Sequence, residues 1–365
     1  MNYKNEPLHI STHVPNGTYE VTVSVTAHED ITFTILSQSR RFMVQDASLK
    51  KGETKDYIFN VSVCDYHKNN EEYTRVNGVM LDILCDGDFS AVSAVSPVDV
   101  PTIYIAGDST VTDQPAEYPY NPSSTYCGWG QMLPQFLDTG IAVENHAQSG
   151  STTADFMRVN FTAFCDKIKA DDFLIVEFGH NDQKIETLDA FGGYTENLKY
   201  FINFAREKGA VPIISSPINR IIFQEDGTLL NLLGDYRNAV KNVCEEMNVP
   251  FLDLWSRTTE FFEAAGPVKA WDYFWGNGTD RDYTHTNDIG GNIVARFAAD
   301  EMIKNAVSPI SELVRKDMIS VVMPEKDSNA KVQNSNELEH LKTIGLVNIP
   351  KSSVLADIDK DITNI

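Results

Sequence analysis

Hydrophobic and polar positions alternate along the first hundred residues of the chain. In residues 19–26, apolar side chains at odd positions alternate with polar ones at even positions, which is the two-residue period of a half-buried β-strand. Further β-rich runs follow at residues 31–36, 41–49, 57–63 and 79–84. Several short strands at this spacing predict an all-β sandwich domain over residues 1–99.

Beyond residue 100, buried apolar runs alternate with amphipathic helical segments. The apolar runs have the length of strands and lie at residues 102–106, 141–145, 173–178, 211–215 and 251–254. Between them, apolar residues such as Leu198, Phe201 and Ile202 recur at helical spacing. This alternation predicts an α/β domain over residues 100–308, with a doubly wound parallel sheet between two layers of helices. The more polar residues 309–365 are expected to form a C-terminal extension.

Charge and hydropathy narrow the choice of partners. The chain has 365 residues and a formal net charge of -22. A strongly negative protein is poorly suited to phosphate-rich partners, so we expect neither nucleic acid nor a membrane surface as a partner. No run of about 20 apolar residues is present, which predicts no transmembrane helix. Residues 1–15 lack the apolar core of a signal peptide, so we expect a cytoplasmic protein; secretion by a leader trimmed from this sequence is the alternative.

The cysteines predict neither a disulfide framework nor a metal centre. There are five of them, at Cys64, Cys85, Cys127, Cys165 and Cys244. They are scattered, odd in number and without a CxxC pair, which is typical of reduced thiols. No group of Cys and His residues has metal-ligand spacing, so we expect no metal and no organic cofactor.

Two motifs carry the residue types of nucleophilic catalysis. Ser109 lies in the sequence GDST directly after the predicted strand 102–106, at the sheet edge where parallel strands end. A serine hydroxyl is a weak nucleophile and needs an adjacent base. Asp282 and His285 lie just before a predicted helix at 290–303, and a carboxylate that holds one imidazole nitrogen lets the other accept the serine proton. The structural alternatives are that Ser109 is an ordinary loop serine, Asp282 a helix cap and His285 a surface histidine.

Two further motifs follow predicted strands at the same edge. Asn181 and His180 belong to the sequence GHND, and the Asn181 amide is a candidate donor to an oxyanion. Gly150 follows the strand 141–145, and its lack of a side chain allows its backbone N–H to approach a substrate. The alternatives are an ordinary asparagine turn and a plain strand-to-helix turn.

The four motifs together resemble the SGNH (GDSL) hydrolase superfamily over roughly residues 101–303. The blocks GDST, N-x-A-x-x-G, GHND and D-x-x-H occur in the superfamily's order. GDSTV, GWG at residues 128–130, GHND and DYTHTN are similar to the blocks of rhamnogalacturonan acetylesterases, and GWG with the asparagine block favours this carbohydrate branch over lipases. The resemblance implies a three-layer, flavodoxin-like α/β/α fold.

The resemblance also implies roles for individual residues. Ser109 would be the nucleophile and His285 the base, oriented by Asp282. The oxyanion hole would consist of the backbone N–H groups of Ser109 and Gly150 and the side chain of Asn181. Where the family carries Gly-Arg-Ser, this chain has Gly150 followed by Ser-Thr, so a contact from that arginine to an anionic sugar is missing.

The resemblance implies an esterase that removes O-acetyl groups from plant cell-wall carbohydrate, above all acetylated rhamnogalacturonan. Trp271 and Trp275 are candidates for stacking on a sugar ring, with a core role as the alternative, and Arg281 and His180 are further candidate substrate contacts. Because a charge of -22 repels a polyanionic pectin, xylan or a neutral oligosaccharide stays an alternative substrate. Two other functions remain open: an esterase for another acyl ester, and a carbohydrate-binding protein without activity.

Overall fold

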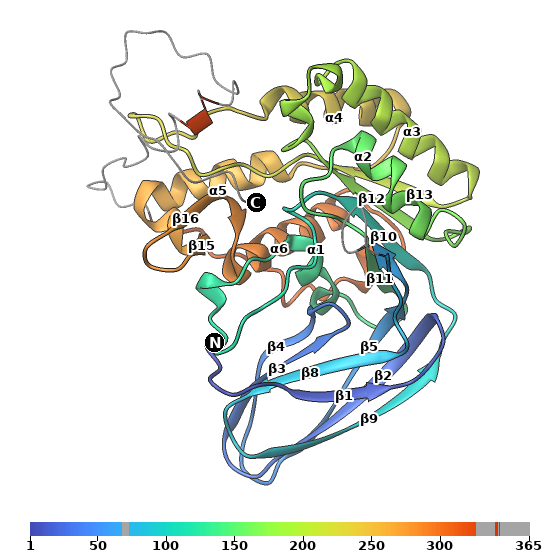
Figure 1. The fold of residues 1–365 in the computed structure, drawn as a ribbon, viewed down its shortest axis with the longest axis vertical. Coiled ribbons are helices and arrows are strands. Elements are labelled where there is room, and N and C mark those ends of the chain that lie inside the picture. The colour runs from blue at the N-terminus through green and yellow to red at the C-terminus, as the bar shows by residue number, and fades with distance from the viewer. Residues whose placement is uncertain (68–72, 326–339, 342, 344–365) are drawn as a thin grey trace.

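Two antiparallel sheets form the N-terminal part of the computed structural model, which describes residues 1–67, 73–325, 340, 341 and 343 (Figure 1). One sheet has the order β1-β8-β3-β4 and the other the order β5-β2-β9. Their strands are β1 (Leu8–Thr12), β2 (Gly17–Ala27), β3 (Ile31–Ser37), β4 (Arg41–Leu49), β5 (Thr54–Val63), β8 (Val79–Cys85) and β9 (Phe89–Pro97), and the short strands β6 (Tyr66–His67) and β7 (Tyr73–Thr74) pair with each other.

The alternating pattern of this region places its apolar side chains in one shared core. Val21, Val23 and Val25 of β2 are fully buried and belong to the same cluster as Phe33 and Ile35 of β3. The polar residues between them face outward, as the two-residue period requires. The sequence pattern does not reveal β9, because the residues of this strand alternate between half-buried and exposed positions at a sheet edge and form no apolar run.

A five-stranded parallel sheet follows, in the order β11-β10-β12-β13-β14. Its strands are β10 (Thr102–Gly107), β11 (Ala142–Asn145), β12 (Phe173–Glu177), β13 (Val211–Ser215) and β14 (Phe251–Leu252). This order, in which the second strand in sequence lies outside the first, is that of a doubly wound sheet. The prediction of an α/β fold is confirmed. The predicted strand 251–254 is shorter in the structure, since Asp253 caps the next helix and its side chain accepts a hydrogen bond from the Ser256 backbone N–H.

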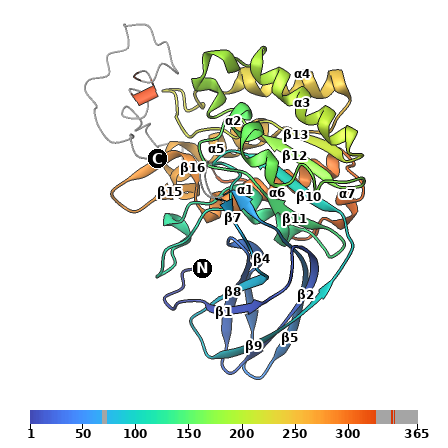
Figure 2. The ribbon, with the colours of Figure 1, turned by 45° about the vertical axis from the view of Figure 1, so that its right-hand side comes forward.

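Helices cover both faces of the parallel sheet (Figures 1 and 2). They are α1 (Trp129–Met132), α2 (Thr153–Arg158), α3 (Gly193–Glu207), α4 (Gly234–Met247), α5 (Leu254–Lys269), α6 (Asp288–Lys304) and α7 (Ile310–Leu313), with short 3-10 turns η1 (Pro122–Ser124), η2 (Leu133–Phe136), η3 (Asn160–Ala163), η4 (Asp182–Lys184), η5 (Glu186–Leu188) and η6 (Ala270–Tyr273). Ile103 and Ile105 of β10 pack into the core beneath α1, α5 and α6, whereas Tyr104 and Ala106 pack into the core beneath α2, α3 and α4.

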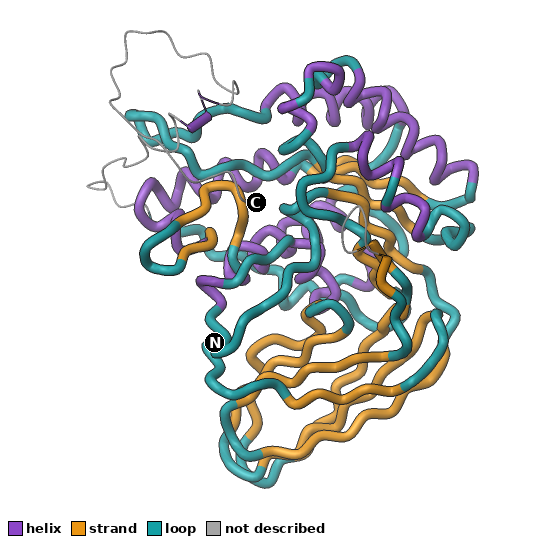
Figure 3. The backbone as a smooth tube through the Cα atoms, in the orientation of Figure 1, coloured by secondary structure: helices purple, strands orange, loops and turns teal. Residues whose placement is uncertain are grey.

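A second hairpin lies between α5 and α6. Strands β15 (Phe274–Gly276) and β16 (Arg281–Thr286) pair antiparallel and lead directly into α6 (Figure 3). The five cysteines are free thiols, as predicted. Within the residues that the structure describes, no helix has the length and apolar character needed to span a membrane.

Candidate active site

Ser109 lies on a tight turn at the carboxyl end of β10. The backbone N–H groups of Val111 and Thr112 donate to the Asp108 carbonyl at 3.1 and 3.2 Å, which closes the turn. Asp108 Oδ1 accepts from the backbone N–H of Thr110 at 3.0 Å, so this buried carboxyl organises the turn from beneath. Ser109 retains 8% exposure at the sheet edge.

The structure brings Ser109, His285 and Asp282 into one hydrogen-bonded line. Ser109 Oγ lies 2.8 Å from His285 Nε2, and His285 Nδ1 lies 2.7 Å from Asp282 Oδ2. Asp282 Oδ1 also accepts the backbone N–H groups of Thr284 and His285 at 2.7 and 3.0 Å. Burial acts to raise the pKa of Asp282, but the hydrogen bond and charge of His285 and these backbone donors outweigh it and lower the pKa below its usual value. The carboxylate is therefore ionised and holds the imidazole with Nδ1 protonated and Nε2 free to accept the serine proton.

Strand β16 holds Asp282 and His285 through contacts with two other segments. The backbone N–H of Cys127 donates to the Thr286 carbonyl at 3.0 Å, and the N–H of Ile221 donates to the Tyr283 carbonyl at 2.9 Å. The chain then enters α6, where Asn287 caps the helix by accepting two backbone N–H groups at 3.0 Å. This segment is a strand because β15 pairs with it, and no local sequence pattern indicates that pairing.

The candidate oxyanion donors lie on two loops at the same sheet edge as Ser109. Gly150 is exposed in the loop after β11 and has φ of 80°, a conformation that glycine adopts without strain. The loop is attached to the end of β10, because the backbone N–H of Gln148 donates to the Gly107 carbonyl at 2.9 Å. Asn181 follows β12, and its Nδ2 donates to the Ser151 carbonyl at 3.1 Å, which connects both loops.

His180 lies behind the site and not in it. Its side chain is 2% exposed, and its Nδ1 lies 3.8 Å from Asp108 Oδ2. Burial and then the charge of Arg220 lower its pKa well below the usual value, so the ring is neutral. The expectation that His180 contacts substrate is wrong, because its ring is enclosed beside Asp108.

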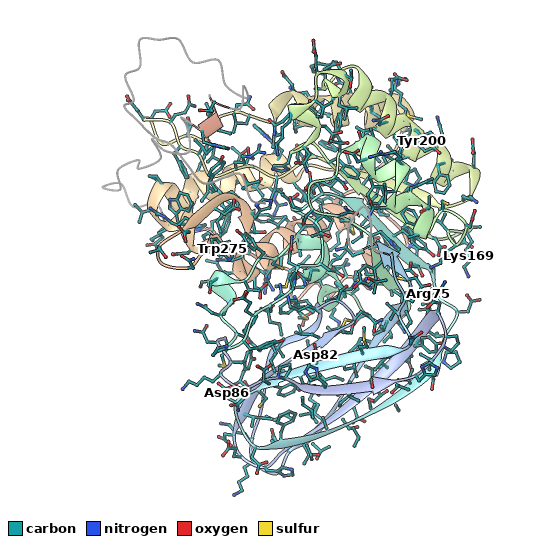
Figure 4. The ribbon with its side chains drawn as sticks, in the orientation of Figure 1. Arg75, Asp82, Asp86, Lys169, Tyr200 and Trp275 are labelled. Carbon is teal, nitrogen blue, oxygen red and sulfur yellow. The ribbon has the colours of Figure 1, made fainter. Side chains whose placement is uncertain are left out.

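An aromatic pair flanks His285. The rings of Trp275 and Tyr126 stack with centroids 4.8 Å apart, and the Tyr126 ring meets the His285 ring edge-on at 5.8 Å. Trp275 is only partly buried and lies on the β15–β16 hairpin (Figure 4). No sequence motif pointed to Tyr126, although this residue stands two positions before the GWG block.

The other two candidate substrate contacts lie together at the start of β16. The guanidinium of the exposed Arg281 lies 4.5 Å from the ring centre of Trp271, and Trp271 packs against the core beneath α5 and α6. Trp271 is only partly buried, whereas Arg281 is next to Asp282 in the chain and open to solvent.

A buried carboxyl that no sequence motif indicated supports the turn that carries Ser109. Glu177 ends β12 and accepts hydrogen bonds from Thr110 Oγ1 at 3.0 Å and from Trp129 Nε1 at 2.7 Å. Burial, and then the charge of Asp108, raise the pKa of Glu177 to about 8. Trp129 is the tryptophan of the GWG block, so that block is tied through Glu177 to the residue that follows Ser109.

One group of possible metal ligands occurs among the described residues, at the contact between β5 and β11. Its members are Cys64, Glu144 and His146, whose ligand atoms lie within 4.8 Å of one another. Motif spacing could not reveal this group, because 80 positions separate Cys64 from Glu144. Glu144 accepts a hydrogen bond from Ser62 Oγ at 2.5 Å and lies 3.0 Å from His146 Nε2, and burial raises the pKa of the Cys64 thiol. These contacts describe a neutral thiol beside a carboxylate that already has partners.

Comparison with known proteins identifies relatives of the parallel-sheet region. Residues 105–292 match the sequence profile of the GDSL-like Lipase/Acylhydrolase family. Rhamnogalacturonan acetylesterase RhgT of Bacillus subtilis (strain 168) is 33% identical over 208 residues, which cover 54% of this chain and 88% of that protein. The probable rhamnogalacturonan acetylesterase YesY of the same strain is 36% identical over 220 residues, 59% of this chain and 98% of that protein.

A solved structure is similar in fold over a longer part of the chain. The crystal structure of the protein YxiM from Bacillus subtilis superposes with a TM-score of 0.54 and 24% identity, covering 82% of this chain and 81% of that one. The fold similarity therefore extends beyond residues 105–292.

Proposed function

Because the chain belongs to the GDSL-like lipase/acylhydrolase family, we propose that it is a serine carbohydrate esterase that removes O-acetyl groups from acetylated rhamnogalacturonan. The observation that carries this proposal is the continuous line from Ser109 Oγ through His285 to Asp282, with contacts of 2.8 and 2.7 Å. Such a line makes a serine hydroxyl nucleophilic near neutral pH.

The reaction proceeds by acyl transfer in two steps. Ser109 Oγ attacks the acetyl carbonyl carbon while its proton moves to His285 Nε2, and ionised Asp282 stabilises the imidazolium. The tetrahedral oxyanion accepts hydrogen bonds from the Ser109 and Gly150 backbone N–H groups and from Asn181 Nδ2, whose second N–H remains after the one given to the Ser151 carbonyl. Collapse breaks the bond to the sugar oxygen, which takes the proton from His285. Water then attacks the acetyl-serine by the same route and releases acetate.

The two relatives named as rhamnogalacturonan acetylesterases support the choice of substrate. The net charge of -22 opposes approach of a polyanion, so cations near the site matter. Arg281 is exposed beside Asp282, and Lys184 Nζ contacts Asn181 Oδ1 at 3.0 Å. Arg220 is buried, so it is not available to a substrate.

We propose the domain division given above: an accessory β-sandwich at residues 1–99, the catalytic domain at 100–308 and an extension at 309–365. The shared core of the two antiparallel sheets supports the sandwich. Ile310 and Val314 pack into the core of the parallel-sheet region, so the first residues of the extension are attached to the catalytic domain.

Acetate release by the wild type and by Ser109→Ala tests the proposal. On acetylated rhamnogalacturonan, acetylated xylan and p-nitrophenyl acetate, we expect the variant to lose at least about 1000-fold in kcat. Equal rates for the two proteins would exclude Ser109 as the nucleophile. A wild type that binds the glycan and releases no acetate would instead favour a carbohydrate-binding protein, and a faster reaction with longer acyl esters would favour another esterase.

A further inference from the structure

The turn between β3 and β4 inserts two arginines from the N-terminal sheets beneath the candidate active site. Gln38 and Arg40 in this turn have φ of 53° and 67°, in the left-handed region that residues other than glycine rarely adopt. Arg40 and Arg41 are 6% and 4% exposed. Strand β4 starts at this turn and lies against α1 and η2. A strained turn with two buried cations indicates that its conformation is held by specific partners.

Arg40 makes five hydrogen bonds to the parallel-sheet region. Its guanidinium donates to both carboxylate oxygens of Asp288, at 2.9 and 3.0 Å. It also donates to the backbone carbonyls of Gln114 and Tyr126, each at 2.7 Å, and to Gln131 Oε1 at 3.2 Å. A guanidinium carries its N–H donors in a rigid, planar fork, so the arginine side chain can bind several acceptors at fixed angles.

These partners are the segments that hold His285. Asp288 is the first residue of α6, three residues after His285. Tyr126 presents its ring to the His285 ring, and its segment pairs with the end of β16 through the Cys127 N–H and the Thr286 carbonyl. The Arg40 guanidinium therefore binds both chain segments that hold the His285 imidazole, the start of α6 at Asp288 and the segment of Tyr126.

Arg41 makes the corresponding contact with the nucleophile side. Its Nε donates to Asp113 Oδ2 at 2.8 Å, four residues after Ser109. Asp113 Oδ1 accepts from Asn145 Nδ2 at 2.8 Å, which ties the same carboxylate to the end of β11 and so to the loop that carries Gly150. The two arginines thus contact the chain segments of Asp288, Tyr126 and Asp113, which converge on the site.

We propose that the β3–β4 turn is a positioning element of the active site, in which Arg40 aligns His285 through Asp288 and Tyr126. The N-terminal region is then a working part of the esterase and not only an appended module. Buried ion pairs often add little stability compared with well-packed apolar residues, so a buried Arg–Asp pair at this place is better explained by the geometry that it imposes. The activity readout rests on the proposed function.

Arg40→Lys is the primary test, because it keeps the charge and removes the fork. With p-nitrophenyl acetate, we expect kcat to fall about 10- to 100-fold and KM to stay within about twofold, since a small ester makes no contact with Arg40 and only the alignment changes. A second variant, Arg40→Met with Asp288→Asn, removes both charges and leaves no unpaired buried carboxylate; it should show the same loss of kcat.

Arg257→Gln is the matched control, because Arg257 pairs with Asp300 and Glu301 near the other end of α6. This variant should be destabilised in thermal melts but keep kcat within about twofold. A readout independent of turnover is the downfield proton resonance of the His285–Asp282 hydrogen bond, which should shift or broaden in the Arg40 variants and not in the control.

The outcomes separate this inference from the proposed function. Folded Arg40 variants with wild-type kcat and an unchanged resonance would overturn the positioning role and leave the esterase proposal intact. A wild type that hydrolyses no ester would defeat the proposed function, while the resonance would still report whether Arg40 aligns His285.

Discussion

We expect the stability of the protein to fall as pH rises from 6.5 to 8, and replacing Glu177 with glutamine should remove most of this fall. The Glu177 carboxyl is enclosed at the end of β12 and accepts hydrogen bonds from Trp129 Nε1 and Ser215 Oγ at 2.7 and 3.2 Å. Burial, and then the charge of Asp108, raise its pKa from 4.5 to about 8. Glutamine has the same shape and no charge at any pH in this range.

The sign follows from proton binding. Between the ordinary pKa and the raised one, the folded protein keeps the Glu177 proton and the unfolded chain releases it, so the free energy of unfolding falls as pH rises. One pKa unit corresponds to about 1.4 kcal/mol, so the loss between pH 6.5 and 8 is about 2 kcal/mol. The range from pH 6.5 to 8 begins at the ordinary pKa of His180, whose folded pKa is lowered, so this histidine adds only a small opposite slope near pH 6.5. The range lies above the pKa of Asp182, which burial raises to about 6.

Urea unfolding followed by circular dichroism at several pH values measures this slope. The wild type should lose about 2 kcal/mol from pH 6.5 to 8, and Glu177→Gln should lose clearly less. The remaining slope near pH 8 comes from buried cysteine thiols such as Cys64, whose pKa is raised in the folded protein. Glu207→Gln, at the exposed end of α3, is the control and should keep the wild-type slope. A wild type whose stability is constant or rises over this range, or a Glu177→Gln variant with the wild-type slope, would refute the reasoning.

Two further substitutions address the proposed chemistry. Asn181→Ala should lower kcat for p-nitrophenyl acetate about 100- to 1000-fold, because one oxyanion donor is lost. Lys184→Met removes only the 3.0 Å contact to Asn181 Oδ1, so it should change kcat for p-nitrophenyl acetate by less than about threefold. Equal effects of the two variants on kcat would argue against the oxyanion role of Asn181. Trp275→Ala should raise KM for an acetylated oligosaccharide about tenfold and leave kcat/KM for p-nitrophenyl acetate nearly unchanged, since Trp275 contacts His285 only through Tyr126. Trp271→Ala is the comparison variant. If Trp275→Ala lowered kcat/KM by a similar factor on both substrates, Trp275 would support the fold and would not bind sugar.

Much of the fold follows from local pattern. The alternating residues of β2 predict a strand that is buried on one face, and the continuous apolar runs of β10 and β12 predict strands that are buried on both faces. The motif blocks resemble those of a known family, and this resemblance pointed to Ser109, Asp282 and His285. Each block also stands beside a strand or helix that the hydrophobic pattern predicts. The family assignment is confirmed by the match over residues 105–292.

What the sequence by itself determined is therefore the order of strands and helices and the positions of the motifs along them. Only the tertiary structure decided that His180 is enclosed, that Tyr126 stands against His285, and that Arg40 lies beneath the site. The physical reason is that period and motif report on neighbours along the chain, whereas these contacts join residues up to 248 positions apart. Such contacts depend on how whole sheets and helices pack, which no local segment encodes.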